Sequence, residues 1–153
     1  MMRLFVLFTL TLGLTLMTFA QTSSSDPVIT LERTACFGTC PVYSLKIYKD
    51  GRVVYEGKEF VKKTGMAEGR IKNKALEDLV AEFMKLNYFD LKKNPDCPIS
   101  ATDFPAAMTS LNWKGRHHAV EHNQGCQGSE LLKELSKLED KIDEVVNTNQ
   151  WIK

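Results

Sequence analysis

Two cysteines separated by three residues, Cys36 and Cys40, constrain the fold of this chain more than any other feature. A disulfide between them requires Cα atoms within about 7 Å, and five extended residues would span more than that. We therefore expect the chain to reverse direction here, with Gly38 as the residue that permits a tight turn. Pro41 restricts Cys40 to an extended conformation, so a strand should begin directly after the turn.

The N-terminus is typical of a secretory signal peptide. Arg3 provides the basic start, residues 4–19 are mostly apolar, and Ala20 ends an imperfect small-residue cleavage site. The apolar run is shorter than the roughly 20 residues that a membrane-spanning helix needs. We predict a signal peptide at residues 1–20 and a flexible leader at 21–27. The protein would then be periplasmic or secreted, with no membrane span after cleavage; a retained N-terminal anchor is the alternative.

Export decides how the four cysteines are interpreted, because disulfides form and persist in oxidising compartments. Four cysteines allow three pairings, and the favoured one is Cys36–Cys40 with Cys97–Cys126. Crossed pairings and free thiols are the alternatives. A bridge that closes a loop of about 30 residues stabilises by about 3.6 kcal/mol in the chain-entropy treatment, and a five-residue loop by about 2 kcal/mol. The long bridge is therefore the expected structural staple, and stability alone gives little reason for the short one.

The charge balance argues against one class of partner. Removal of Arg3 with the signal peptide leaves 19 basic and 19 acidic side chains. A chain without net charge has no electrostatic reason to bind nucleic acid or an anionic membrane.

Period-two alternation of apolar residues predicts short strands, and turn signals join two pairs of them into hairpins. The Asp-Gly pair at 50–51 favours a type I′ turn, which requires positive φ at both central residues and would place Ile47 opposite Val54. The Lys-Gly pair at 114–115 marks the second hairpin. The expected strands are 28–32, 43–47, 52 to about 60, 68–71, 109–113 and 117–122.

Two later segments carry apolar residues along one helical face. The first runs from 73 to about 86 with Asn73 as its cap, and the second follows a Ser129 cap. Hairpins imply an antiparallel sheet, and both helices must bury their apolar faces on it. The expected fold class is therefore α+β: an antiparallel sheet of about five to six short strands, with two amphipathic helices packed on one face. We predict a single domain at residues 28–153.

The sequence predicts no catalytic residue, no metal site and no cofactor. The C-x3-C pair lacks the C-x-x-C redox spacing, and a strand follows it instead of the helix that would lower a cysteine pKa. His118 and His122 share a strand face but lie too far apart for one ion, so a solvated hairpin explains the histidines better. His122 could complete a Cys3His zinc site with Cys36, Cys40 and Cys126, an alternative that export disfavours.

A block of six residues, Cys-Phe-Gly-Thr-Cys-Pro at 36–41, is the most specific motif of the chain. Weaker landmarks are Leu31-Glu32-Arg33, Tyr48, Tyr55-Glu56-Gly57, Thr102-Asp103, His122, Gly125-Cys126, Leu138-Glu139, Ile142-Asp143 and Trp151-Ile152. With these residues the chain resembles an uncharacterised family of exported bacterial domains of unknown function that has a Cys-Phe-Gly-x-Cys-Pro-x-Tyr signature. The resemblance implies export and a domain that spans nearly the whole mature chain, and it transfers no activity or catalytic residue.

The sequence favours an exported, disulfide-stabilised and non-enzymatic domain that binds an envelope or extracellular partner. The expected contact surface is the sheet face away from the helices or the edge formed by the cysteine turn. Candidate residues at that edge are Phe37, Gly38, Thr39, Pro41 and Tyr43. The alternative is a thiol- or metal-dependent enzyme centred on Cys36 and Cys40, with His122 as a further candidate.

Overall fold

The computed structural model describes residues 26–153, so the predicted signal peptide and most of the predicted leader lie outside the described residues. The strands are β1 Ile29–Arg33, β2 Val42–Ile47, β3 Arg52–Glu59, β4 Gly65–Arg70, β5 Ile99–Ser100, β6 Ala106–Trp113, β7 Arg116–Asn123 and β8 Cys126–Gln127. The helices are α1 Asn73–Lys85, the 3₁₀-helix η1 Tyr88–Asp90, α2 Glu130–Val146 and α3 Asn149–Ile152.

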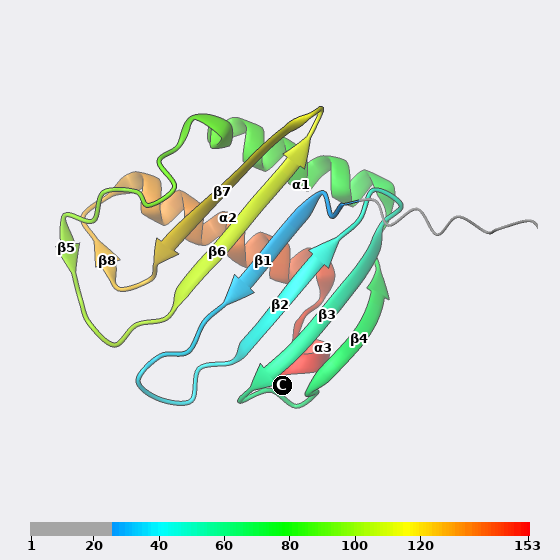
Figure 1. Ribbon diagram of the computed structural model, residues 1–153, viewed down its shortest axis with the longest axis horizontal. Coiled ribbons are helices and arrows are strands. Elements are labelled where there is room, and N and C mark those ends of the chain that lie inside the picture. Colours follow the sequence, from blue (N-terminus) through cyan, green and yellow to red (C-terminus); the bar gives the residue numbers. More distant parts are fainter. Residues whose placement is uncertain (1–25) are drawn as a thin grey trace, which may run out of the picture.

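Six strands form one antiparallel sheet in the order β4-β3-β2-β1-β6-β7, and β5 pairs with β8 in a separate two-stranded sheet. The first strand lies inside the sheet, where it pairs with both β2 and β6. Figure 1 shows α1 and α2 on the same face of this sheet. The expected α+β fold, an antiparallel sheet with two helices on one face, is therefore confirmed.

The two hairpins differ in how well the sequence predicted them. Trp113 pairs with Arg116 across a two-residue turn in which Lys114 and Gly115 both have positive φ, as expected. In the first hairpin the expected register is wrong by one residue, because Ile47 pairs with Val53. The Tyr48 N–H donates to the Arg52 carbonyl at 2.9 Å, so the loop has three residues, 49–51, and Gly51 alone has positive φ there. A three-residue loop with a left-handed final residue uses the same Asp-Gly sequence as a type I′ turn.

The helix caps follow the sequence in one case and not in the other. The Ser129 hydroxyl accepts a hydrogen bond from the Leu132 N–H at 3.4 Å, so the predicted cap of α2 is confirmed. The predicted Asn73 cap is wrong, because Asn73 is the first helical residue and Lys72, without a side-chain hydrogen bond, occupies the cap position. Packing of the apolar face therefore holds the start of α1 without side-chain capping.

The core fills the space between the sheet and the two long helices. Leu31, Leu45 and Tyr55 are fully buried on the helix-facing side of the strands, where they join Phe83 of α1 and Ile142 of α2 in one cluster. Burial of each large apolar side chain stabilises the fold by about 1.5–3 kcal/mol. The two amphipathic stripes predicted from the sequence are thus the faces that the helices bury.

The C-terminal helix α3 packs against the end of the sheet at which β2 begins. Trp151 stacks on Tyr55 with ring centroids 4.8 Å apart, and Tyr55 lies 5.8 Å from the ring of Tyr43. The Lys63 N–H donates to the Trp151 carbonyl at 2.8 Å, which attaches the β3–β4 loop to the same helix. The sequence did not predict this four-residue helix.

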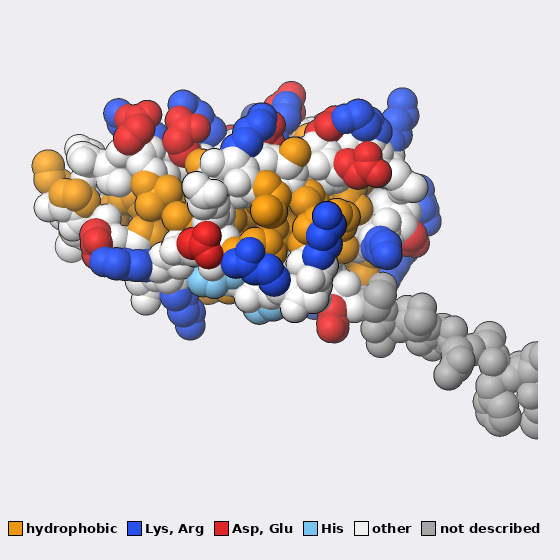
Figure 2. Space-filling view, turned by 90° about the horizontal axis from the view of Figure 1, so that it is seen from above, with side chains coloured by type: hydrophobic (Ala, Val, Ile, Leu, Met, Phe, Trp, Pro, Cys, Tyr) orange, Lys and Arg blue, Asp and Glu red, His pale blue; other side chains and the backbone are white. Residues whose placement is uncertain are grey.

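The outer face of α2 is solvated and carries charges of both signs. Lys133 pairs with Glu130 and Lys137 with Glu134. Figure 2 shows such alternating basic and acidic side chains along one side of the molecule, with hydrophobic side chains between them and the opposite margin. Within residues 26–153, no helix is long and apolar enough to cross a membrane.

Candidate functional site

Both disulfides are present in the structure, with the pairing that the sequence favours. Cys36 bonds to Cys40 and Cys97 bonds to Cys126, with Cα separations of 5.8 and 5.4 Å. All four cysteines of the chain are therefore bonded, and the oxidised protein offers no thiolate to an enzyme centred on Cys36 and Cys40. Within the described part of the chain, no group of three or more His, Cys, Asp or Glu residues could hold a metal ion.

The cysteine turn, residues 34–41, is held by its own disulfide and by hydrogen bonds to the segment that leads into β6. The Gly38 N–H donates to the Cys36 carbonyl at 2.9 Å, so the tightest part of the turn centres on Phe37. The Phe37 N–H donates to the carbonyl of Asp103, and Thr34 exchanges two hydrogen bonds with Ala106. These bonds attach the turn to the loop before β6, while the disulfide closes it from within.

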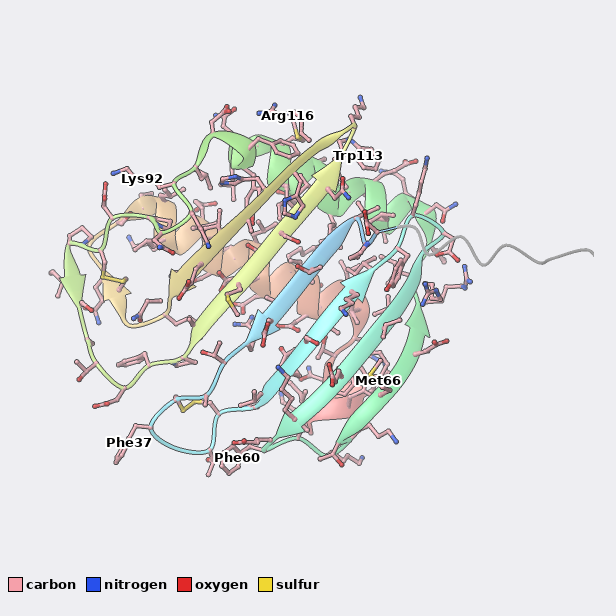
Figure 3. The ribbon with its side chains drawn as sticks, viewed as in Figure 1. Phe37, Phe60, Met66, Lys92, Trp113 and Arg116 are labelled. Carbon is pink, nitrogen blue, oxygen red and sulfur yellow. A yellow bond between two sulfur atoms is a disulfide. The ribbon has the colours of Figure 1, made fainter. Side chains whose placement is uncertain are left out.

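Three exposed phenylalanines lie on three loops at this end of the sheet. Phe37 is 89% exposed, Phe60 52% and Phe104 53%. Pairing of Val42 with Glu59 places Phe60 beside the exit of the cysteine turn, and the Phe37–Asp103 bond places Phe104 beside its tip. Figure 3 shows Phe37 and Phe60 at the same end of the molecule, pointing away from the sheet. We call these three loops the aromatic end.

A cleft of about 480 Å³ opens beside the cysteine turn. Thr34, Cys40, Pro41 and Pro105 form its turn side, and α2 and the C-terminal residues form its other side. Its remaining lining residues are Arg33, Tyr43, Gln124, Asp140, Asp143, Glu144, Asn149, Ile152 and Lys153. Of the predicted edge residues, Pro41 and Tyr43 line this cleft, whereas Phe37, Gly38 and Thr39 belong to the tip.

A transverse row of residues in register forms the floor of this region. Arg33 pairs with Tyr43 on β2 and with Ala107 on β6, and Ala107 pairs with His122 on β7. Arg33 follows Ile29 and Leu31 in the inward alternation of β1, so its guanidinium lies under α2 and is only 14% exposed. The small side chain of Ala107 leaves room in the row for polar groups from α2.

Two carboxylates of α2, one helical turn apart, reach this row. Asp143 accepts hydrogen bonds from Arg33 Nε and Nη2 at 3.0 and 2.8 Å and from the Tyr43 hydroxyl at 2.7 Å. Glu139 lies 3.8 Å from Arg33 Nη1 and 2.9 Å from His122 Nδ1. Arg33 and Tyr43 flank the cysteine turn, so Asp143 clamps both of its ends.

Burial and charge shift the pKa values within this network. Burial lowers the pKa of Arg33, but the charge of Asp143, its hydrogen bond with Arg33 and the interactions with Tyr43 and Glu139 together outweigh burial and raise the pKa above its usual value. Burial raises the pKa of Tyr43, and the charge of Asp143 raises it further. Tyr43 therefore stays neutral and donates its hydrogen bond, and Arg33 stays charged.

Two features of this network correct the sequence interpretation. His122 was assigned to a solvated hairpin, but its side chain is only 3% exposed because α2 covers β7 and presents Glu139 to it. Glu139, Arg33 and Asp143 were not recognised as partners. Glu139 did carry a signal, since it lies four residues after Leu135 and three before Ile142, on the buried face of α2. A carboxylate at a core position requires a partner, and the sequence contained that cue.

The family match spans the cysteine turn and the network beneath it. A model of a domain of unknown function, DUF6438, matches residues 27–146, from β1 through the end of α2. The chain belongs to the DUF6438 family. No curated protein matches the chain. Membership in DUF6438 thus covers the cysteine turn, the network beneath it and both disulfides, and it assigns no activity to them.

Tyr43→Phe tests the clamp in this DUF6438 domain. At neutral pH we expect a loss of about 1.5–3 kcal/mol, the usual worth of a hydrogen bond to a charged group. Because the pKa of Tyr43 is raised in the folded state, its contribution is complete below the unfolded pKa of about 10 and is lost as the pH rises above it. The measurement is urea unfolding at several pH values from 8 to strongly alkaline.

The other tyrosines serve as an internal control for this experiment. Burial raises the pKa of Tyr88 to about 12, and Tyr88 is present in both proteins. The difference in stability between wild type and Tyr43→Phe should therefore shrink above pH ~10. A difference that is constant with pH would mean that Tyr43 does not donate to Asp143.

Proposed function

We propose that this DUF6438 domain is exported to the periplasm or the cell exterior and acts there as a binding domain without catalysis of its own. Its binding surface is the aromatic end, with the cysteine turn as the tip that enters the partner. The partner is an envelope or extracellular protein with an apolar pocket for Phe37. The signal-like N-terminus and the two disulfides support the compartment.

One observation carries the proposal: a fully exposed aromatic side chain sits on a loop that is fixed in place. Phe37 is 89% exposed, although burying a phenyl group stabilises by about 1.5–3 kcal/mol. Aromatic side chains that enter a partner's pocket supply much of the binding energy in many interfaces. Exposure in the free protein becomes favourable burial in the complex, which explains why an apolar residue occupies the tip.

The short disulfide fits this role better than a role in stability. A five-residue loop is worth only about 2 kcal/mol, whereas a tip that is ordered before binding loses little conformational entropy in the complex. The hydrogen bond from Phe37 to Asp103 and the Arg33–Asp143–Tyr43 clamp also order the tip before binding. These bonds together hold the backbone at Phe37 in one position.

The other surface that the sequence suggested, the sheet face away from the helices, is less suited to a partner. Thr30 and Ser110 hydrogen-bond each other at 2.6 Å, and Lys58 pairs with Glu32 at 2.9 Å. Polar groups that already have partners gain little from a second protein, since each must exchange one hydrogen bond for another. This comparison favours the aromatic end.

Photo-crosslinking tests the proposal. A photoreactive phenylalanine analogue in place of Phe37 should give a discrete adduct in the envelope of cells that make the protein. The matched control is the same analogue at Met84, another exposed apolar residue, on α1. Identical adducts from both positions, or none from position 37, would contradict the proposal.

A further inference from the structure

The strand β4 forms one edge of the six-stranded sheet, and its outer side is open (Figure 1). The Ile71 N–H donates to the Gly51 carbonyl at 2.9 Å, so the backbone groups of residue 71 point toward β3. Because these groups alternate along an antiparallel strand, those of Met66, Glu68 and Arg70 point away from β3. All three residues are exposed, and within residues 26–153 no backbone–backbone hydrogen bond uses their outward groups. The strand β4 therefore presents unpaired N–H and C=O groups to solvent.

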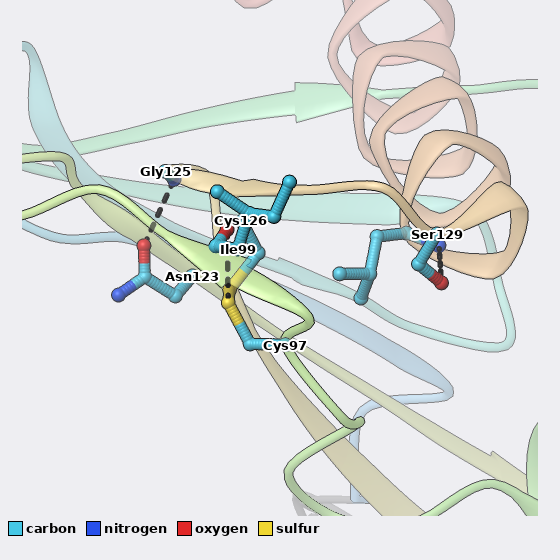
Figure 4. The surroundings of a disulfide bond; sticks show 7 residues. Cys97, Ile99, Asn123, Gly125, Cys126 and Ser129 are labelled. Atoms are coloured by element: carbon cyan, nitrogen blue, oxygen red, sulfur yellow. Dashed lines mark hydrogen bonds between the residues drawn. A yellow bond between two sulfur atoms is a disulfide. The ribbon is translucent and has the colours of Figure 1, made fainter.

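The other edge of the sheet, β7, is covered by a loop. The Glu121 N–H donates to the Lys93 carbonyl at 2.7 Å, which places the loop after η1 along this strand. The Cys97–Cys126 disulfide then ties the same loop to the segment that follows β7, next to Asn123 (Figure 4). An uncovered edge strand is a template for pairing with another chain, and proteins usually cover or interrupt it. The described part of the chain thus protects β7 and leaves β4 free to pair.

The charges of β4 are complementary to those of a second copy of the same strand. In an antiparallel pair of two β4 strands, the residue on the two-fold axis decides which side chains lie opposite each other. With Gly69 on the axis, Glu68 lies opposite Arg70 of the second copy, and Arg70 lies opposite its Glu68. With residue 68 on the axis the two Glu68 carboxylates oppose each other, and with Ala67 on the axis Glu68 lies opposite Met66. Opposite charges across a strand pair stabilise it and like charges destabilise it, so charge selects the Gly69 register.

Both charges are available for these cross-strand pairs. Glu68 forms no ion pair with any residue in the range 26–153. Arg70 donates to the Asp50 carbonyl at 2.6 Å and lies 3.6 Å from the Asp50 carboxylate, yet its side chain is 65% exposed. A guanidinium has five N–H donors, so it can accept a further carboxylate partner. Arg70 also lies directly opposite Arg52 on β3, and a carboxylate from a second copy would offset that like-charge pair.

We propose that two copies of this domain pair through β4, antiparallel and with Gly69 on the two-fold axis, to form one continuous sheet. Glu68 and Arg70 of each copy then contribute both the backbone hydrogen bonds and the ion pairs of the interface. Antiparallel pairing turns the second copy end for end, so the two aromatic ends point in opposite directions. An interface confined to one edge strand is smaller than the ~1,200–2,000 Å² of a stable complex, so the dimer exchanges with the monomer. The pairing does not involve Phe37, so it holds or fails independently of the proposed function.

Amide hydrogen exchange followed by NMR at increasing protein concentration tests this interface residue by residue. Sedimentation should show a dimer by about 1 mM protein. The Glu68 and Arg70 N–H groups should then exchange more slowly, in proportion to the dimer fraction that sedimentation measures. The N–H of Lys114, in the exposed turn between β6 and β7, is the control and should exchange at one rate throughout. A protein that stays monomeric, even one that binds extended peptides at β4, would overturn the second copy as the occupant of this edge.

Charge variants separate this interface from any other contact between copies. Glu68→Arg places like charges opposite each other twice in the dimer, so it should weaken dimerisation by at least about tenfold. Glu77→Arg makes the same change at an exposed position of α1 and should leave dimerisation unchanged. The double variant Glu68→Arg with Arg70→Glu exchanges the two charges and should restore the dimer. Dimerisation that Glu68→Arg leaves intact, or that the folded double variant does not recover, would contradict the proposed register.

Discussion

Replacing both Cys97 and Cys126 by serine is expected to lower the free energy of unfolding by about 2–5 kcal/mol. The bond joins residues 29 positions apart, and it anchors the long loop after η1 to the segment that leads into α2. Without it the unfolded chain gains the conformations that the closed loop excluded. Urea unfolding, with the midpoint and slope both fitted, measures the loss.

The short disulfide is the matched control for this experiment. Replacing Cys36 and Cys40 by serine removes a bond of the same kind across a separation of four residues. Its chain-entropy contribution is about 2 kcal/mol, so the loss should be smaller than for the long bond. Equal losses would mean that the cysteine turn contributes to the stability of the core, and the assignment of the long bond as the staple would be wrong.

Arg33→Met is expected to cost about 3–5 kcal/mol, the usual effect of removing one partner from a buried ion pair. Arg33 is the cation that lies between Asp143 and buried Glu139, and the substitution leaves both carboxylates without it. Lys58→Met is the control, because Lys58 pairs with Glu32 in solvent and should contribute less than about 1 kcal/mol. Both are measured by urea unfolding at neutral pH.

A double variant separates the ion pair from simple loss of packing. Asp143→Asn in the Arg33→Met background removes one of the uncompensated charges, so part of the lost stability should return. If the double variant is less stable by the sum of the two single losses, Arg33 and Asp143 do not interact energetically. That result would mean that the Arg33–Asp143 pair does not hold the cysteine turn.

Local patterns predicted the elements whose structure depends on neighbouring residues. The stripe from Leu135 to Ile142 predicted the buried face of α2, and the Lys114-Gly115 pair predicted its hairpin. The register predicted for the first hairpin was wrong because two turn types accept the same Asp-Gly sequence, and they differ by one residue in register. The central place of β1 was not predicted, because pairing with β6 joins residues about 80 positions apart.

The sequence predicted only those parts of the candidate site whose residues lie close together in the chain. The cysteine turn was recognised from its spacing, and its exposed Phe37 was among the candidate residues. The Arg33–Asp143 pair spans 110 residues, so no spacing rule could find it. His122 was placed on the same strand face as His118, but its burial depends on the helix that covers that face. Glu139 was the one network residue whose own pattern, a charge within an apolar stripe, indicated a buried partner.

The most direct test of the binding function compares the position-37 crosslink in the wild-type domain and in the variant that lacks Cys36 and Cys40. The variant should fold, since the long disulfide and both helices hold the core. If the short bond fixes the tip for binding, the variant must order the cysteine turn when the complex forms. That ordering costs roughly 2 kcal/mol, which corresponds to about 30-fold weaker binding. The account predicts an adduct yield reduced by tenfold or more at limiting partner, with little change at saturating partner. An adduct of undiminished yield in a folded variant would contradict the claim that the cysteine turn exists to present Phe37.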